Sequence, residues 1–248
     1  MFRLLRLNPP NGWSAVAWEL AIVTIGVLIA LAAQHWAESR SWQGKADASK
    51  AALREELALH YHFAVEFRVV YPCLQAQLDV LRERVLSSGE TLDPAPVHHE
   101  RGTYVLRIPA KFYPSDVWAE AIGDGIVQHF DPEFRRRLAE NYASLETISA
   151  LNAASTEDEQ SLMVLSHPLP LDSSTRYSIV REIELMSSRF RYLDLLNGQL
   201  IDSVEHLGMV PPAEDSQSVT ERYGTYHFCK GRDLPMRSFK EAMQSIPN

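Results

Sequence analysis

The sequence predicts a mainly α-helical protein, with one N-terminal transmembrane helix followed by an antiparallel helical bundle with long helices. The run from Leu20 to Ala33 is apolar apart from Thr24. Beyond it, apolar residues recur at spacings of three and four, and helices with such stripes bury them against one another in bundles. The predicted divisions are a short cytoplasmic N-terminus (1–12), a transmembrane helix (13–37), an exported helical bundle (38–212) and a peripheral C-terminal segment (213–248).

Aromatic residues bound the apolar run. From Trp13 to Trp36 the segment is long enough to cross a hydrocarbon layer of roughly 30 Å at about 1.5 Å per residue. Tryptophans at the ends of a span typically anchor it at the membrane–water interfaces. The predicted anchors are Trp13, Trp18 and Trp36, with Trp42 just beyond them.

The charges around the span predict its orientation. Arg3 and Arg6 precede it, whereas the segment after it carries charges of both signs. This bias predicts a cytoplasmic N-terminus and an exported C-terminal domain. A cleaved signal peptide, with Ala30-Leu31-Ala32 as its cleavage site, is the alternative. The long stretch before the apolar run and the tryptophans at both of its ends favour an uncleaved anchor.

Small residues gather on one face of the predicted span. At 100° per residue, that face carries Glu19, Val23, Gly26, Ala30, Ala33 and Ala37. Gly26 and Ala30 form a small-x-x-x-small pair, which permits close approach of a second helix in lipid. A carboxylate beside lipid is costly unless it meets a partner or water. We therefore predict that this face contacts a helix of another membrane subunit or of a second copy. The alternative is that Glu19 reaches the cytoplasmic headgroups and the small residues have no role.

The same segment resembles the N-terminal signature of a family of bacterial single-span membrane proteins of unknown function. The signature is E-x6-G-[IV]-L-I-A-L-x4-W-x-E-x-[RK], and the matching residues are Glu19, Gly26-Val27-Leu28-Ile29-Ala30-Leu31, Trp36, Glu38 and Arg40. Family members usually carry Gln and two Asn between this Leu and this Trp, where the present chain has Ala32-Ala33-Gln34-His35. The resemblance implies a single-span protein of the bacterial inner membrane, with its C-terminal domain in the periplasm, and no particular activity.

Amphipathic stripes predict the bundle helices. We expect a helical stripe over 46–87 that Pro72 kinks or breaks near 68–71; the stripe keeps its phase across Pro72, which favours the kink. A short helix after Ser115-Asp116 and a helix that starts at Asp131-Pro132-Glu133 follow. A polar break over 154–158, a short helix over 160–165 and a long helix over 174–208, capped by Gly208, follow.

The remaining segments are predicted to be irregular. The proline-rich connector over 90–114 contains GTYVLRIP, which is typical of a short strand and could pair with YGTYHF near the C-terminus. The polar segment from Glu214 onward is expected to be peripheral, with one helix over 238–245.

Composition and motifs exclude several classes of function. The formal net charge of −8 does not fit a nucleic-acid-binding protein. The chain contains no G-x-S-x-G, P-loop or H-E-x-x-H motif, so we predict no catalytic residue, cofactor or metal. We expect the remaining polar segments to have structural roles: a core histidine at His60, a loop at His98-His99-Glu100, a solvated acidic turn at Glu157-Asp158-Glu159 and surface ion pairs at Arg135-Arg136-Arg137.

Cys73 and Cys229 are the only cysteines, too few for a disulfide framework. The expectation is two reduced or unrelated thiols, with a single bridge as the alternative if the domain is exported.

These observations predict a non-catalytic accessory or structural subunit of a larger inner-membrane complex. Its partners would be integral membrane subunits or a second copy, with lipid around the span. The alternative is a periplasmic ligand-sensing or binding module that acts through a membrane partner, because only about 12 residues precede the span.

Overall fold

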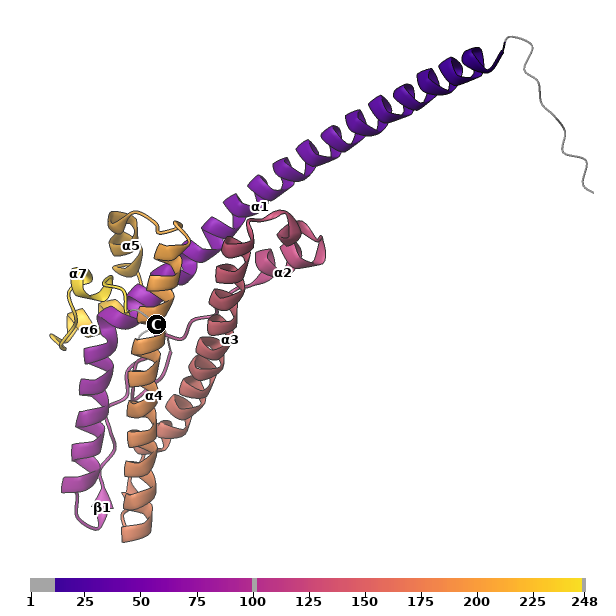
Figure 1. Cartoon of the computed structure of the whole chain (residues 1–248). Coiled ribbons are helices and arrows are strands. Elements are labelled where there is room, and N and C mark those ends of the chain that lie inside the picture. Colours follow the sequence, from indigo (N-terminus) through magenta and orange to yellow (C-terminus); the bar gives the residue numbers. More distant parts are fainter. Residues whose placement is uncertain (1–11, 100–101, 247–248) are drawn as a thin grey trace, which may run out of the picture.

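The computed structural model describes residues 12–99 and 102–246, and the surroundings of their side chains from Val16 onward. Arg3, Arg6, Glu100 and the side chain of Trp13, which the sequence singled out, lie outside this description. The described part is mainly helical, and one long helix extends away from a bundle (Figure 1). The predicted fold class is therefore confirmed as far as a long apolar N-terminal helix joined to a helical bundle.

The predicted membrane helix and the first bundle helix form one continuous helix, α1 (Gly12–Ser87). Its N-terminal part projects from the bundle, and its C-terminal part packs within it (Figure 1). Ala46 is the first buried residue of the described chain. The predicted boundary at 37/38 is thus not a break in the helix; the surroundings of α1 change a few turns later.

Pro72 lies inside α1 without ending it, and α1 bends in its second half (Figure 1). Proline has no backbone N–H for the carbonyl of Arg68, and its ring crowds the preceding turn. A segment from the far end of the chain contacts this turn, because the backbone N–H of Arg237 donates to the carbonyl of Val69 at 2.9 Å. The kinked helix expected from the sequence is confirmed.

Two further α-helices, each followed by a 3-10 turn, build the middle of the bundle. α2 (Asp116–Gly123) leads into the 3-10 turn η1 (Ile126–His129), and α3 (Pro132–Ser161) leads into η2 (Leu162–Ser166). The start of α3 is as predicted, since the side chain of Asp131 accepts hydrogen bonds from the backbone N–H groups of Glu133 and Phe134. The predicted break over 154–158 is wrong. α3 continues because this stretch packs on the next helix, where Asp158 forms an ion pair with Arg189.

The long helix α4 (Ser173–His206) lies close to its predicted bounds. Gly208, with φ of 66°, follows it in the left-handed conformation that a non-glycine residue rarely adopts. α4 runs antiparallel to the second half of α1 and to α3 (Figure 1). This arrangement places α4 at the centre of the bundle.

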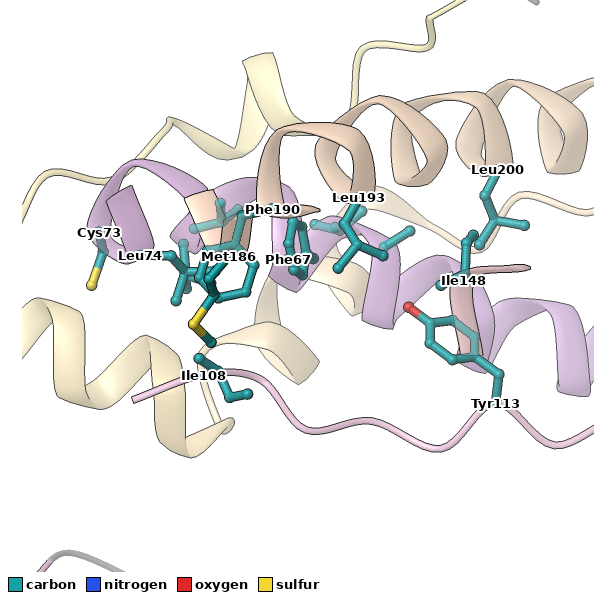
Figure 2. Close-up of a cluster of buried hydrophobic side chains, with 14 of the residues drawn as sticks. Phe67, Cys73, Leu74, Ile108, Tyr113, Ile148, Met186, Phe190, Leu193 and Leu200 are labelled. Atoms are coloured by element: carbon teal, nitrogen blue, oxygen red, sulfur yellow. The ribbon is translucent and has the colours of Figure 1, made fainter. Parts of the chain in front are cut away.

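The core lies where these helices meet. Figure 2 shows large side chains of α1 and α4 interleaved, with residues of α3 and the connector beside them. Each is buried: Phe67, Leu74, Ile108, Tyr113, Ile148, Met186, Phe190, Leu193 and Leu200. Burial of one such side chain contributes about 1.5–3 kcal/mol, so this contact stabilises the whole bundle.

Strand pairing differs from the sequence prediction. β1 (Thr91–Leu92) pairs antiparallel with β2 (Leu169–Pro170), whereas the predicted strand GTYVLRIP contributes an isolated bridge between His98 and Tyr104. YGTYHF lies mostly in α6 (Gly224–Gly231). The helical spacing of Thr225, Phe228 and Cys229, all buried, explains this outcome better than strand alternation.

The C-terminal segment is part of the bundle, so the predicted peripheral placement of 213–248 is wrong for the described residues 213–246. It contains α5 (Ala213–Thr220), α6 and α7 (Phe239–Ala242), and all three contact α1. Their buried residues include Phe228 and Ala242. α7 lies within the predicted range 238–245, and a reciprocal capping box between Ser238 and Glu241 starts it.

Candidate functional site

The exposed apolar part of α1 is the candidate functional site. Among the described helices, α1 alone is long and apolar enough to cross a membrane, and its most apolar stretch has no buried residue. Leu20 and Ile29, for example, are 67% and 64% exposed. So large a continuous apolar surface is unusual on a protein surrounded by water and is typical of contact with lipid or with another helix.

The residues of the predicted partner face are all exposed on this stretch: Glu19, Val23, Gly26, Ala30, Ala33 and Ala37. A methyl group added at Gly26 would meet nothing within 4 Å. The predicted anchors Trp18 and Trp36 are also exposed, at 70% and 66%. The fold therefore leaves this face free of contacts with the rest of the described chain.

Trp42 marks the place where α1 enters the bundle. Its ring stacks on His129 of η1, with centroids 4.3 Å apart, and the ammonium group of Lys45 lies 4.5 Å from the ring centroid. Two hollows of about 610 and 650 Å³ share Trp42 as a lining residue. The sequence predicts Trp42 near the membrane but does not predict its contact with His129, since no local pattern links residues so far apart.

A buried polar cluster surrounds His60. Glu56 accepts a hydrogen bond from the hydroxyl of Tyr142 at 2.5 Å and another from the backbone N–H of Val117 at 3.1 Å. His60 is fully buried, and its Nε2 lies 2.7 Å from the carbonyl oxygen of Pro114. The ring of Trp118 stacks on Tyr142 at 5.1 Å. His60 thus joins α1 to the connector, and its predicted place in the core is confirmed.

Burial lowers the pKa of His60 from 6.5 to about 4, despite the hydrogen bond to Pro114. Between pH 6.5 and about 4, the imidazole of His60 therefore binds a proton in the unfolded chain but not in the folded chain. Stability is complete above pH 6.5 and is lost as the pH falls towards 4. We expect protonation of His60 to lower the free energy of unfolding by up to about 3 kcal/mol. The measurement is urea unfolding of wild type and His60→Gln at several pH values. Parallel pH dependence of the two proteins would contradict the expectation.

Two clusters of ion-paired side chains join the connector and the C-terminal segment to α1. Lys111 Nζ lies 2.7 Å from Glu66 Oε2, and the Glu66 side chain is buried. Arg237 donates two hydrogen bonds to the carboxylate of Asp194, at 2.8 and 3.0 Å, and Arg68 of α1 lies 3.6 Å from the same carboxylate. Burial raises the pKa of Glu66, and the ammonium of Lys111 opposes that shift.

A disulfide joins Cys73 of α1 to Cys229 of α6, with Cα atoms 6.0 Å apart and a sequence separation of 156. Both cysteines are buried. The expectation of two unrelated thiols is wrong, and the alternative of a single bridge holds. Because Cys73 directly follows Pro72, the bond fastens the C-terminal segment beside the bend of α1.

The weaker chemical candidates find structural roles. Within the described residues, no group of three or more His, Cys, Asp or Glu side chains could hold a metal ion. Arg136 and Arg137 pair with Glu133, and Arg136 also pairs with Glu140, as predicted. Residues 157–159 belong to α3 rather than to a turn, because Asp158 pairs with α4.

Comparison of the chain with protein-family models, with curated proteins and with solved structures finds no match. The fold and the exposed helix thus define a class, a helical bundle on one long apolar helix, without assigning a family. The resemblance of the N-terminal segment to a single-span family stays a prediction.

Proposed function

We propose that this protein is a non-catalytic accessory or structural subunit of a larger bacterial inner-membrane complex. The observation that carries the proposal is the exposed apolar part of α1, which is continuous with the helix that forms the core of the bundle. A helix that is rigidly joined to a folded domain fixes that domain at a set place above the membrane. Such positioning is what an accessory subunit contributes to an assembly.

The orientation in this proposal places the bundle in the periplasm. The disulfide between Cys73 and Cys229 supports it, because such bonds persist in oxidising compartments and are rare in the cytoplasm. Arg3 and Arg6 precede the span. They favour a cytoplasmic N-terminus, because basic residues that flank a span tend to stay on the cytoplasmic side. Two independent features of the chain thus agree.

The partner in this proposal docks on the face that contains Glu19, Gly26 and Ala30. The small residues admit a neighbouring helix at short distance, and Glu19 pairs with a cationic or hydrogen-bond-donating group of that neighbour near the cytoplasmic interface. Free exposure of this face supports the idea, since no other element of the described chain covers it.

Substitution on this face is expected to weaken partner retention. Gly26→Leu or Ala30→Leu inserts bulk between the two helices and should lower the yield of co-purified membrane subunits about fivefold or more. The same change leaves the bundle intact, because the space beside Gly26 is open within this chain. Leu28→Ala, on the opposite face, is the matched control. Native purification in mild detergent with quantification of co-migrating proteins gives the ratio. Equal losses for all three variants would rule out the assigned face.

A ligand-sensing module that acts through a membrane partner is the second candidate. The continuity of α1 from the exposed stretch into the core favours it, because a ligand held at the bundle would then bear directly on the membrane helix. In the purification above, a small molecule retained in the bundle would support this candidate, and stoichiometric membrane subunits without a ligand would support the first.

A further inference from the structure

The hollow of about 610 Å³ lies between α1 and α2, which contact each other where α1 leaves the bundle (Figure 1). We call it the α1–α2 groove. Ala48, Ser49 and Ala52 of α1 form one side of it, and Val117 and Ala121 of α2 form the other. Because the side chains on the α1 side are small, a further helix can approach the backbone of α1 closely there.

The groove continues the face of α1 on which the proposed partner docks, so this inference rests on the proposed function. Small-x-x-x-small pairs recur along α1 at a spacing of 11 residues, and all six residues are exposed: Gly26 with Ala30, Ala37 with Ser41, and Ala48 with Ala52. At 100° per residue, a step of 11 residues turns a helix by only about 20° beyond three full turns. Such a spacing suits a right-handed pair of helices, which is also the hand of the small-x-x-x-small contact. A helix that docks on Gly26 and Ala30 therefore reaches the groove if it continues in the same direction.

In the proposed topology, the groove lies outside the membrane. Ala48 and Ala52 follow the interfacial anchor Trp36 by 12 and 16 residues, which places them about 18 and 24 Å further along the helix. The headgroup layer on one side of a bilayer is only roughly 5–8 Å thick. A lipid held in the bilayer does not reach the groove, whereas a membrane helix that extends beyond its own span does.

The charges of the groove favour a basic occupant. Glu120 and Asp124 lie four residues apart at the end of α2, and both are exposed residues that line the groove. Neither carboxylate forms an ion pair within the described part of the chain. Lys45 is the one basic lining residue, and its ammonium group lies 4.5 Å from the centroid of the Trp42 ring. The groove therefore carries more negative than positive charge.

We propose that the α1–α2 groove binds the exported end of the partner's transmembrane helix, a helical segment that carries Lys or Arg opposite Glu120 and Asp124. The partner helix then contacts α1 at two levels. Within the membrane, small residues give close packing. Outside it, the two carboxylates fix the rotation of the partner helix and select a basic segment. Basic residues are less frequent on the exported flank of a span than on its cytoplasmic flank, so this pairing distinguishes the partner from most other membrane helices.

Site-specific photo-crosslinking of the full chain in intact cells tests the proposal. A photo-crosslinking amino acid replaces either Val27, beside the docking face in the membrane, or Ser49 in the groove, 22 residues further along α1. We expect both probes to capture the same integral membrane protein, at two peptides about 22 residues apart, since the two helices rise together. The peptide captured from Ser49 should carry Lys or Arg outside the span. A Ser49 probe that captures a second copy of this chain, a different protein or no protein overturns the groove.

A probe at Leu28, on the opposite face of the membrane helix, is the control for proximity. It should capture the same protein at least about fivefold less than the probe at Val27 does. Equal capture from Leu28 would mean that the crosslinks report random collision in the membrane, which would overturn the assigned contact.

A pair of matched double variants tests the role of the two carboxylates. Glu120→Lys with Asp124→Lys should lower the yield of the Ser49 crosslink about fivefold or more, as exposed ion pairs allow, and leave the Val27 crosslink within about twofold. Glu83→Lys with Glu146→Lys makes the same change of charge at exposed positions outside the groove and should alter neither crosslink. A Ser49 crosslink that survives the first pair, or is lost equally in both, overturns the basic occupant.

The probe at Val27 separates this proposal from the docking on which it rests. Failure of that probe to capture an integral membrane subunit contradicts the proposed docking face itself. Capture from Val27 without capture of the same subunit from Ser49 contradicts only the groove.

Discussion

Breaking the disulfide between Cys73 and Cys229 is expected to lower the free energy of unfolding by about 2–5 kcal/mol. The bond closes a loop of 156 residues in the unfolded chain, and the entropy that it removes there grows with loop length. For a domain of this size, each 1 kcal/mol corresponds to about 2–4 °C in the unfolding temperature. Thermal unfolding of the full chain in detergent, with and without reductant, measures the difference.

The double variant Cys73→Ala with Cys229→Ala is the control for reduction. It should unfold near the temperature of the reduced wild type, and reductant should not shift it further. A wild-type chain whose thiols are shown to be free, yet which unfolds at the same temperature as the oxidised chain, would contradict the stabilising role. Alkylation of free thiols in cells before lysis also tests the location of the bundle. A predominantly reduced pair would argue against an exported bundle.

The helices were predictable because their signal is local. Long apolar stripes with a clear start, such as Asp131-Pro132 before α3, and a clear end, such as Gly208 after α4, are properties of neighbouring residues. The continuity of α3 through residues 154–158 was not predictable by the same means. Its polar residues look like a break until Asp158 is seen beside Arg189, which lies 31 residues away in another helix.

The disulfide and the C-terminal segment were missed for a related reason. The segment after Glu214 is polar on average, which hides the few residues, among them Phe228 and Cys229, that it buries. The pairing of Cys73 with Cys229 depends on how α6 folds back on α1, and spacing alone does not encode it. Non-local contacts of this kind require the three-dimensional arrangement.

The candidate site divides in the same way. The exposed face of α1 follows from helical periodicity, so Glu19, Gly26 and Ala30 could be chosen from the sequence. The hollow beside Trp42 could not be, because His129 completes it from a different element, η1.

Removal of the ammonium group from Lys111 is expected to destabilise the protein by about 3–5 kcal/mol near pH 8, because Lys111→Met leaves the buried carboxylate of Glu66 without its counter-charge. Glu66 Oε1 accepts no hydrogen bond from the described part of the chain, and the attraction of Arg107 for this carboxylate is smaller than that of Lys111. Lys240→Met, which removes an exposed lysine of α7, is the matched control and should change stability by less than about 0.5 kcal/mol.

The pH dependence of the same variant distinguishes a stranded charge from a loss of packing. Burial raises the pKa of Glu66 in the folded chain above the unfolded value of 4.5, and loss of Lys111 raises it further. Stability from the neutral carboxyl is present below pH 4.5 and is lost as the pH rises through the folded pKa. The deficit of Lys111→Met should therefore be small near pH 4.5 and grow towards pH 8. Glu66→Gln with Lys111→Met should recover most of the loss at pH 8, since no buried charge remains. Urea unfolding across this range measures both effects, and a deficit that is constant with pH would assign the loss to packing alone.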